Sequence, residues 1–284
     1  MAIFTIARLT LREAARRRLL VTVAVLTLVM IFFTAWGFSR LNTLTCRGQP
    51  CPPSEIKVLA AGLLILVAYM FNVILALGSV FVVAPAIAGD VDSGVALAML
   101  PRPIRRSDLL LGKWLALVVL IVGYTAVTGA LEFAAVNLVI GYVPPHPVIA
   151  LAYLAAQGIV LLTFALLCST RLAPMTTGVI AVVLFGLAWI GGIAEAIGIA
   201  FENATIASVG TVMSLLMPTD GLWRGTIFNM EPVALISVAG TSRGLAANPF
   251  FVNAPPSTAY HVWAFAWVVG ILGLAMFSFA KRDL

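Results

Sequence analysis

One short polar segment separates two long apolar runs of this chain, and it reads Gly89-Asp90-Val91-Asp92-Ser93-Gly94-Val95-Ala96-Leu97-Ala98-Met99-Leu100-Pro101-Arg102-Pro103-Ile104-Arg105-Arg106-Ser107-Asp108. A bilayer core about 30 Å thick needs roughly 20 helical residues, and the runs on both sides are long enough to cross it. A charged segment between two such runs has to lie in water. We therefore expect an all-α integral membrane protein in which polar segments join transmembrane helices.

The composition of the whole chain agrees with insertion into a membrane. Of its 284 residues, 62% are hydrophobic and 10% are charged, and the mean hydropathy is +1.10, whereas an ordinary soluble domain carries about 25% charged residues. The net charge of +6 does not indicate nucleic acid, because the basic residues stand at the ends of apolar runs. We expect contact with a lipid bilayer and no nucleic-acid partner.

Uncharged windows bounded by charged residues predict six transmembrane helices in a single domain, 1–284. Prolines break the chain between the third and fourth helices, and Arg171 with Pro174 marks the turn after the fourth. Six crossings place both chain ends on the same side of the membrane. The predicted spans are 19–39, 58–89, 114–140, 148–169, 175–200 and 259–280.

The positions of lysine and arginine predict the orientation of these helices. With both termini inside, five of the 17 basic residues lie in outer segments and the other twelve lie in cytoplasmic ones. We therefore expect the cell (plasma) inner membrane, with the N- and C-termini in the cytoplasm. The five outer residues are Arg40, Arg47, Lys57, Arg224 and Arg243.

Residues 1–18 precede the first span and predict a helix of their own. Phe4, Ala7 and Leu11 recur at helical spacing while arginines occupy another face, which is typical of an interfacial helix on the cytoplasmic leaflet. A plain basic flank that only sets topology is the alternative. We favour the helix, because Glu13 stands four residues before an arginine.

The polar segment 90–108 predicts a short cytoplasmic helix. Asp90 and Asp92 suit a helix N-terminus, and Pro101 ends the helix. Ser107 or Asp108 is then expected to cap the following span. A solvated loop with ordinary positive-inside charges is the alternative.

The segment 201–257 is expected on the outer side, between the fifth and sixth spans. It holds two apolar stretches, 207–217 and 222–230, separated by a turn signal at 218–221. These stretches predict short extracytoplasmic helices that lie in the outer leaflet or pack against the spans.

Two cysteines and two acids are further candidate site residues. Cys46 and Cys51 share an outer loop, where a disulfide or two free thiols is expected. A soft metal such as Cu(I) is a weaker alternative, because no histidine lies nearby. Glu132 and Glu195 lie inside apolar runs, where an acid is costly. We favour contact with outer water, or pairing with Arg224 or a backbone donor, over substrate binding or proton coupling.

No motif in the sequence predicts an enzyme or a bound cofactor. The chain has no His-Glu-x-x-His and no Gly-x-x-x-x-Gly-Lys-Ser/Thr loop that would cradle phosphates, and its Ser, His and Asp residues follow no plausible order for a catalytic triad. We therefore expect no catalytic residues, no resident metal and no ATP hydrolysis by this chain.

The polar segment and its flanks resemble the loop between the second and third spans of ABC-2-type transporter permeases. Stretches at 7–13 and 279–284 are also similar to that family, and 218–224 is similar to permeases of the nitrous-oxide reductase maturation type. The resemblance thus covers nearly the whole chain. The matching residues of the loop are Asp92, Gly94, Leu97, Leu100, Pro103, Ile104, Arg105, Gly112 and Lys113.

This resemblance implies the transmembrane subunit of an ATP-binding cassette exporter. Two permease copies, identical or related, would pair and form the pathway with their first, second and fifth spans, where Gly191 and Gly192 suit close helix approach. Two copies of a separate ATPase subunit would hold ATP and Mg. The coupling helix in 90–108 would contact that ATPase through Asp90, Asp92, Gly94, Leu97, Leu100, Pro103 and Arg105.

The sequence says less about the transported substrate and about the energy source of transport than about the fold. An apolar pathway favours a hydrophobic or amphipathic substrate. An ATP-independent secondary transporter that uses Glu132 and Glu195 as proton sites, and a membrane assembly scaffold, stay open as alternatives.

Overall fold

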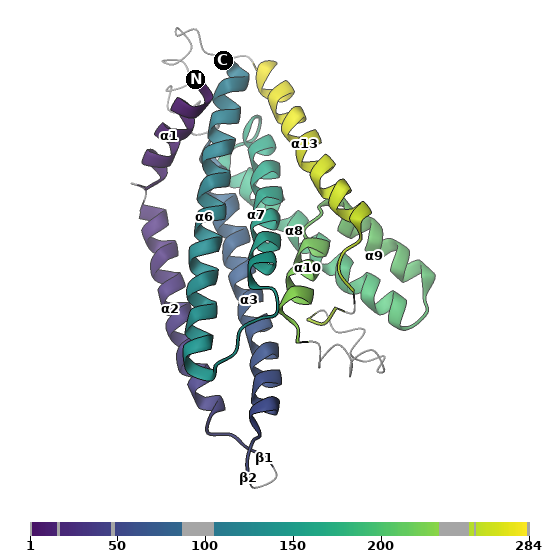
Figure 1. Ribbon diagram of the computed structural model, residues 1–284. Coiled ribbons are helices and arrows are strands. Elements are labelled where there is room, and N and C mark those ends of the chain that lie inside the picture. The colour runs from purple at the N-terminus through teal and green to yellow at the C-terminus, as the bar shows by residue number, and fades with distance from the viewer. Residues whose placement is uncertain are drawn as a thin grey trace.

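The computed structural model describes residues 2–15, 18–46, 49–86, 105–232, 250–252 and 254–282. Six long helices and three shorter ones account for most of them (Figure 1). The long helices are α2 (Arg18–Leu41), α3 (Pro53–Val83), α6 (Arg106–Ile140), α7 (Pro147–Ser169), α8 (Pro174–Ala200) and α13 (Thr258–Ala280). The shorter elements are α1 (Ala2–Ala15), α9 (Ala204–Leu216), α10 (Asp220–Met230) and a hairpin of β1 (Thr45–Cys46) and β2 (Gln49–Pro50).

All six long helices are long and apolar enough to cross a membrane. The expectation of an all-α, multi-pass membrane protein is therefore confirmed at the level of its helices. The two short outer stretches predicted at 207–217 and 222–230 correspond to α9 and α10, and the first helix lies inside 1–18.

Two of the expected spans begin five or more residues later than the helices of the structure. Helix α3 begins at Pro53 rather than at 58, because proline fits the first turn of a helix, where its missing N–H is not needed. Helix α6 begins at Arg106 rather than at 114. The charged residues that marked this boundary in the sequence stay in the helix, and Lys113 is buried and donates from Nζ to the carbonyl of Ala86.

The expected cap of α6 at Ser107 or Asp108 is wrong. Arg105 is the N-cap residue, with extended backbone and no side-chain capping bond, so Ser107 and Asp108 lie inside the first turn. The acid at Asp108 still suits the positive end of the helix dipole.

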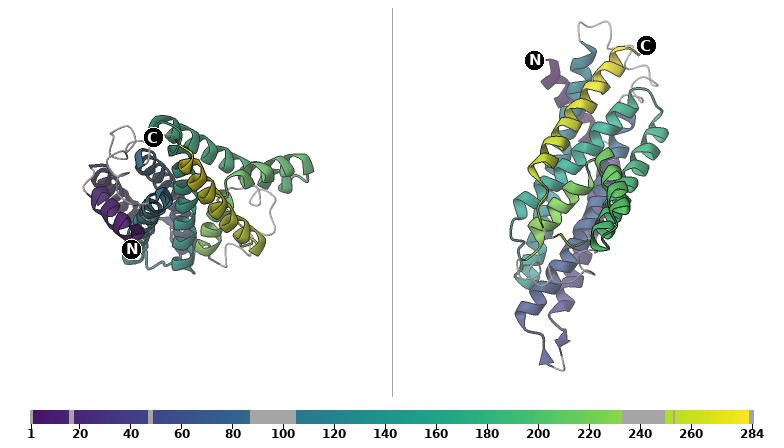
Figure 2. Two further views of the ribbon diagram at one scale, coloured as in Figure 1. Left: turned by 90° about the horizontal axis from the view of Figure 1, so that it is seen from above. Right: turned by 90° about the vertical axis from the view of Figure 1, so that its right-hand side faces the viewer.

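The helices form an elongated bundle with two distinct ends. Helix α1 and the C-terminal end of α13 lie at one end, and the β1–β2 hairpin lies at the opposite end (Figure 1). Seen from above, α8 and α9 extend to the side, away from α1 and α2 (Figure 2). We call the end that holds α1 the basic end, because it also carries Arg106, Arg171 and Arg282.

Burial differs strongly between the long helices. In the most apolar window of α7, 56% of the residues are buried, against 17% in α2 and in α13. Helix α7 is therefore the centre of the fold, and α2 and α13 present most of their apolar side chains to lipid or to another protein.

Candidate functional site

A cavity of about 430 Å³ lies between α8, α9, α10 and the segment that leads into α13. Its polar wall is made by side chains from four helices, and its apolar wall by aromatic, aliphatic and proline residues. The polar wall comprises Glu195, Thr211, Ser214, Asp220, Arg224, Ser257 and Tyr260. We call this space the outer cavity after the expectation from the sequence that the segment between the fifth and sixth long helices lies on the outer side, because most of its lining comes from that segment and the adjoining helix ends.

Arg224 connects the helices around the outer cavity. Its Nη2 donates to Glu195 Oε2 at 3.0 Å and to the carbonyl of Gly192 at 2.7 Å, both on α8. Its Nε lies 2.8 Å from Asp220 Oδ2, one turn earlier on α10. One guanidinium thus binds two carboxylates from two helices. Arg224 was one of the partners that the sequence suggested for Glu195, and the structure brings the two residues together.

Glycines explain why α8 and α9 approach closely enough to form this site. A Cβ at Gly210 would lie 2.8 Å from the Cα of Glu195, and a Cβ at Gly191 would lie 2.6 Å from the Cβ of Met213. A Cβ at Gly192 would overlap the Asp220 carboxylate. The close approach expected at Gly191 and Gly192 therefore occurs within the chain, against α9 and α10.

The close packing of α8 and α9 also orders the second oxygen of Glu195. Thr211 on α9 donates its hydroxyl to Glu195 Oε1 at 2.6 Å. Both oxygens of this carboxylate are thus held, one by Arg224 and one by Thr211.

Tyr260 joins α13 to the N-terminus of α10. Its hydroxyl oxygen accepts the backbone N–H of Gly221 at 3.0 Å. The first N–H groups of a helix have no partner within the helix, and the N-cap residue Thr219 makes no side-chain capping bond. A residue from another helix therefore serves as part of the cap of α10.

The charges of the described side chains that line the outer cavity do not balance. Burial raises the pKa of Asp220 to about 6, because the charged form loses water; Arg224 opposes this shift and Glu195 adds to it. Above that pH Asp220 carries a negative charge beside the ion pair of Arg224 and Glu195. The side chains of Arg224 and Glu195 remain 28% and 21% exposed, against 7% for Asp220, so the network can be reached from the cavity.

Glu132 lies in a different environment, buried in α6. Thr34 of α2 donates its hydroxyl to Glu132 Oε1 at 3.4 Å, and Oε2 has no hydrogen-bond partner among the described residues. The structure thus gives Glu132 a partner on α2, whereas Arg224 pairs with Glu195 and Asp220 instead. The two intramembrane acids therefore do not form one site.

Glu231 is a further buried acid that the sequence did not single out. It is 1% exposed, and its Oε1 accepts the backbone N–H of Val252 at 3.2 Å. Burial raises the pKa of Glu231 to about 8, with the Val252 hydrogen bond acting in the opposite direction. Val252 lines the outer cavity, so Glu231 helps to hold one wall of it.

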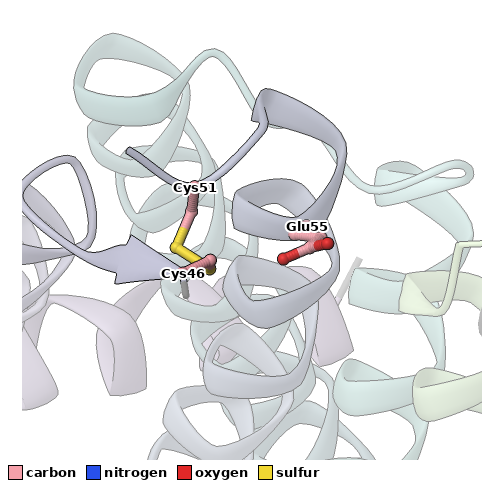
Figure 3. Close-up of side chains that lie close together, drawn as sticks. All are labelled: Cys46, Cys51 and Glu55. Carbon is pink, nitrogen blue, oxygen red and sulfur yellow. A yellow bond between two sulfur atoms is a disulfide. The ribbon is translucent and has the colours of Figure 1, made fainter. Parts of the chain in front are cut away.

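Cys46 and Cys51 form a disulfide that closes the β1–β2 hairpin (Figure 3). Glu55, in the first turn of α3, lies beside it, and the two sulfurs and a carboxylate oxygen lie within 4.8 Å of one another. A disulfide offers no thiolate, which is the form that binds metals. With both cysteines in the disulfide, Glu55 is the one member of this group that could still bind a metal ion.

Most residues of the expected coupling helix lie outside the described residues. These are Asp90, Asp92, Gly94, Leu97, Leu100 and Pro103. Arg105 is described, and it lies at the basic end as the N-cap of α6.

The basic end is held together by arginines that donate to helix C-termini. Arg106 Nη1 donates to the carbonyl of Arg282 at 2.6 Å, and Arg282 Nη1 donates to the carbonyl of Thr170 at 2.7 Å. Cations suit these positions, because the C-terminal end of a helix carries partial negative charge. The start of α6 is thereby joined to the ends of α7 and α13.

Comparison with known proteins assigns no family to the chain. No protein-family model matches it, and no curated protein matches its sequence.

Proposed function

We propose that the chain is the permease subunit of an ABC-2-type ATP-binding cassette exporter. The observation that carries this proposal is the packing of α1 on α6 at Gly112. A Cβ at Gly112 would lie 2.7 Å from the Cβ of Ile6 and 2.9 Å from the carbonyl oxygen of Ile3. Gly112 belongs to the Gly-Lys pair that ends the family-like loop, so the N-terminal helix and the flank of the polar segment form one unit.

The surface of α1 supports an interfacial position for this helix. Ala7 is buried, whereas Phe4 is 73% exposed and Leu9 is 58% exposed. Apolar side chains next to arginines suit the boundary between headgroups and acyl chains. In the proposed exporter α1 lies on the cytoplasmic leaflet, and 90–108 holds the coupling helix.

The orientation that we propose places the basic end in the cytoplasm of a cell with an inner (plasma) membrane. Arginines concentrate at that end, in agreement with the positive-inside rule, and the Cys46–Cys51 disulfide lies at the opposite end (Figure 1). Disulfides persist in oxidising compartments outside the cytoplasm. Both features support the same orientation.

The proposed assembly contains two permease copies and two copies of an ATPase subunit. ATP and Mg bind to the ATPase, which pushes on the coupling segment through Asp90, Asp92, Gly94, Leu97, Leu100, Pro103 and Arg105. A hydrophobic or amphipathic substrate then crosses between the permease copies.

The proposal is tested by isolating the chain from its native membranes and measuring bound ATPase activity. A Leu97→Asp, Leu100→Asp double variant should lose the ATPase, because two charges enter the contact surface. Leu44→Asp is the matched control, since Leu44 is 40% exposed near the hairpin at the other end. Wild-type chain without bound ATPase activity would contradict the proposal.

The secondary-transporter alternative predicts a different result. It requires transport without ATP that depends on Glu132 or Glu195. ATP-independent transport that is lost in Glu132→Gln or Glu195→Gln would favour it over the exporter.

A further inference from the structure

We propose that the outer cavity binds an organic ammonium group, with Glu195 and Asp220 providing the negative charge and Trp189 an aromatic wall. This inference concerns a ligand site within one copy of the chain. It is independent of the ATPase and of the pathway between two permease copies.

The charge of the described lining selects a cation. Glu195, Asp220 and Arg224 are the charged side chains among the described lining residues, which leaves one formal negative charge when both acids are ionised. Excess charge in a partly dehydrated site is stabilised by a ligand of opposite sign. A monovalent cation would bring the described lining to neutrality.

An anion is disfavoured by the way Arg224 is held. Its Nη2 and Nε already donate to Glu195, Gly192 and Asp220. An incoming anion would have to compete with two fixed carboxylates for the same guanidinium. A hard divalent metal is disfavoured as well, because it needs several oxygen ligands around one point, and here the guanidinium lies between the two carboxylates.

The apolar wall selects an organic cation over a small hydrated one. Trp189, Phe251 and Tyr260 contribute aromatic rings to the lining, and Ile193, Leu215 and Pro255 contribute aliphatic surface. Aromatic faces attract ammonium groups, and most strongly where water is excluded. The volume of about 430 Å³ falls in the usual range for small-molecule sites.

The two carboxylates have different roles in this site. Glu195 is held at both oxygens but remains 21% exposed, so a ligand in the cavity can reach it. Asp220 is 7% exposed and acts mainly through its charge. Glu195 is therefore the residue to change first.

The binding experiment uses the purified full chain in an uncharged maltoside detergent and benzyltrimethylammonium as the probe. Equilibrium dialysis measures the dissociation constant, with benzyl alcohol as the uncharged counterpart. Glu195→Gln should weaken binding of the cation by on the order of tenfold, the effect of losing about 1.4 kcal/mol. Glu195→Asp keeps the charge and should retain binding.

Glu202→Gln is the matched control, because Glu202 is an exposed acid outside the cavity lining. A second variant, Trp189→Leu, leaves the ion pairs in place. It should weaken the binding of the cation more than the binding of benzyl alcohol. Thermal unfolding and size-exclusion profiles verify that each variant is folded. Equal affinity for the cation in wild type, Glu195→Gln and Trp189→Leu would overturn the proposal, as would equal affinity for the cation and the alcohol.

A further pair of measurements distinguishes a free amine from a lipid headgroup. The chain is placed in nanodiscs of phosphatidylglycerol alone or with phosphatidylethanolamine, and the probe is titrated in both. If phosphatidylethanolamine lowers the apparent affinity for the probe, the natural ligand is a lipid headgroup. If the probe affinity is the same in both nanodiscs, the natural ligand is a soluble amine. Absence of probe binding in both nanodiscs would overturn the proposal.

Discussion

Arg224 and Glu195 form an ion pair at 3.0 Å between α10 and α8, in a chain whose α8 and α10 are separated by the whole of α9. The pair therefore joins α10 back to α8 after the chain has passed through α9. Its contribution to stability comes from what is left behind when one partner is removed, because a partly buried carboxylate without a counter-charge is unfavourable.

Replacing Arg224 by glutamine should lower the free energy of unfolding by about 1–3 kcal/mol, below the cost of breaking a fully buried pair, because both side chains are partly exposed. Thermal unfolding in detergent measures the effect. Removing the two acids as well, in Arg224→Gln, Glu195→Gln, Asp220→Asn, should recover part of the loss. A triple variant less stable than Arg224→Gln would show that the unpaired carboxylates are not the source of the loss.

Replacing Gly210 by alanine should separate α8 from α9. The added Cβ would lie 2.8 Å from the Cα of Glu195, and overpacking of this kind costs about 1–3 kcal/mol. Gly186→Ala on α8 is the control, because a Cβ there meets nothing within 4 Å. Gly210→Ala should lower the unfolding temperature relative to Gly186→Ala, and equal temperatures would contradict the close packing.

Glu231 should make stability fall as pH rises. Its pKa is raised from 4.5 to about 8, so between these values the native state holds a proton that the unfolded state has released. The stabilisation is complete below pH 4.5 and is lost as pH approaches 8, by up to about 1.4 kcal/mol per pH unit. Unfolding at pH 5, 6, 7 and 8 measures the slope, and Glu231→Gln should flatten it. An unchanged slope in that variant would assign the pH dependence to other groups.

The Cys46–Cys51 disulfide provides a test of orientation. In intact cells, a membrane-impermeant phosphine followed by an impermeant maleimide should label the chain only after reduction. Cys46→Ser, Cys51→Ser should abolish the labelling, and Cys168→Ser should leave it unchanged, because Cys168 lies at the basic end of α7. Labelling that requires cell lysis would place the hairpin on the cytoplasmic side.

Hydropathy alone predicted which segments become long helices, because the thickness of a bilayer sets their length. Their ends were less predictable. Lys113 looked like a boundary, yet its ammonium group is satisfied by the carbonyl of Ala86, and α6 continues past it to Arg106. A charged residue ends an apolar window in the sequence, but it ends a helix only when nothing nearby can bind it.

The outer cavity was only partly visible in the sequence. Arg224 was a stated partner of Glu195, and the spacing of Asp220 and Arg224 at i and i+4 could have added a second acid. Tyr260 and Thr34 gave no such signal. Their partners, Gly221 and Glu132, lie 39 and 98 positions away in the chain, and contacts of that kind follow from packing and not from local pattern.

Helix α13 is held by hydrogen bonds near both of its ends, and most of its apolar residues are not buried within the chain. Tyr260 and Trp263 bind α10 and α9 near its start, Arg106 of α6 binds the carbonyl of Ala280 at its end, and only 17% of its apolar window is buried. Its 23 residues span about 34 Å. Such a helix can act as a strut between the first turn of α6 at the basic end and the cap of α10, and it links these two places without a continuous polar path.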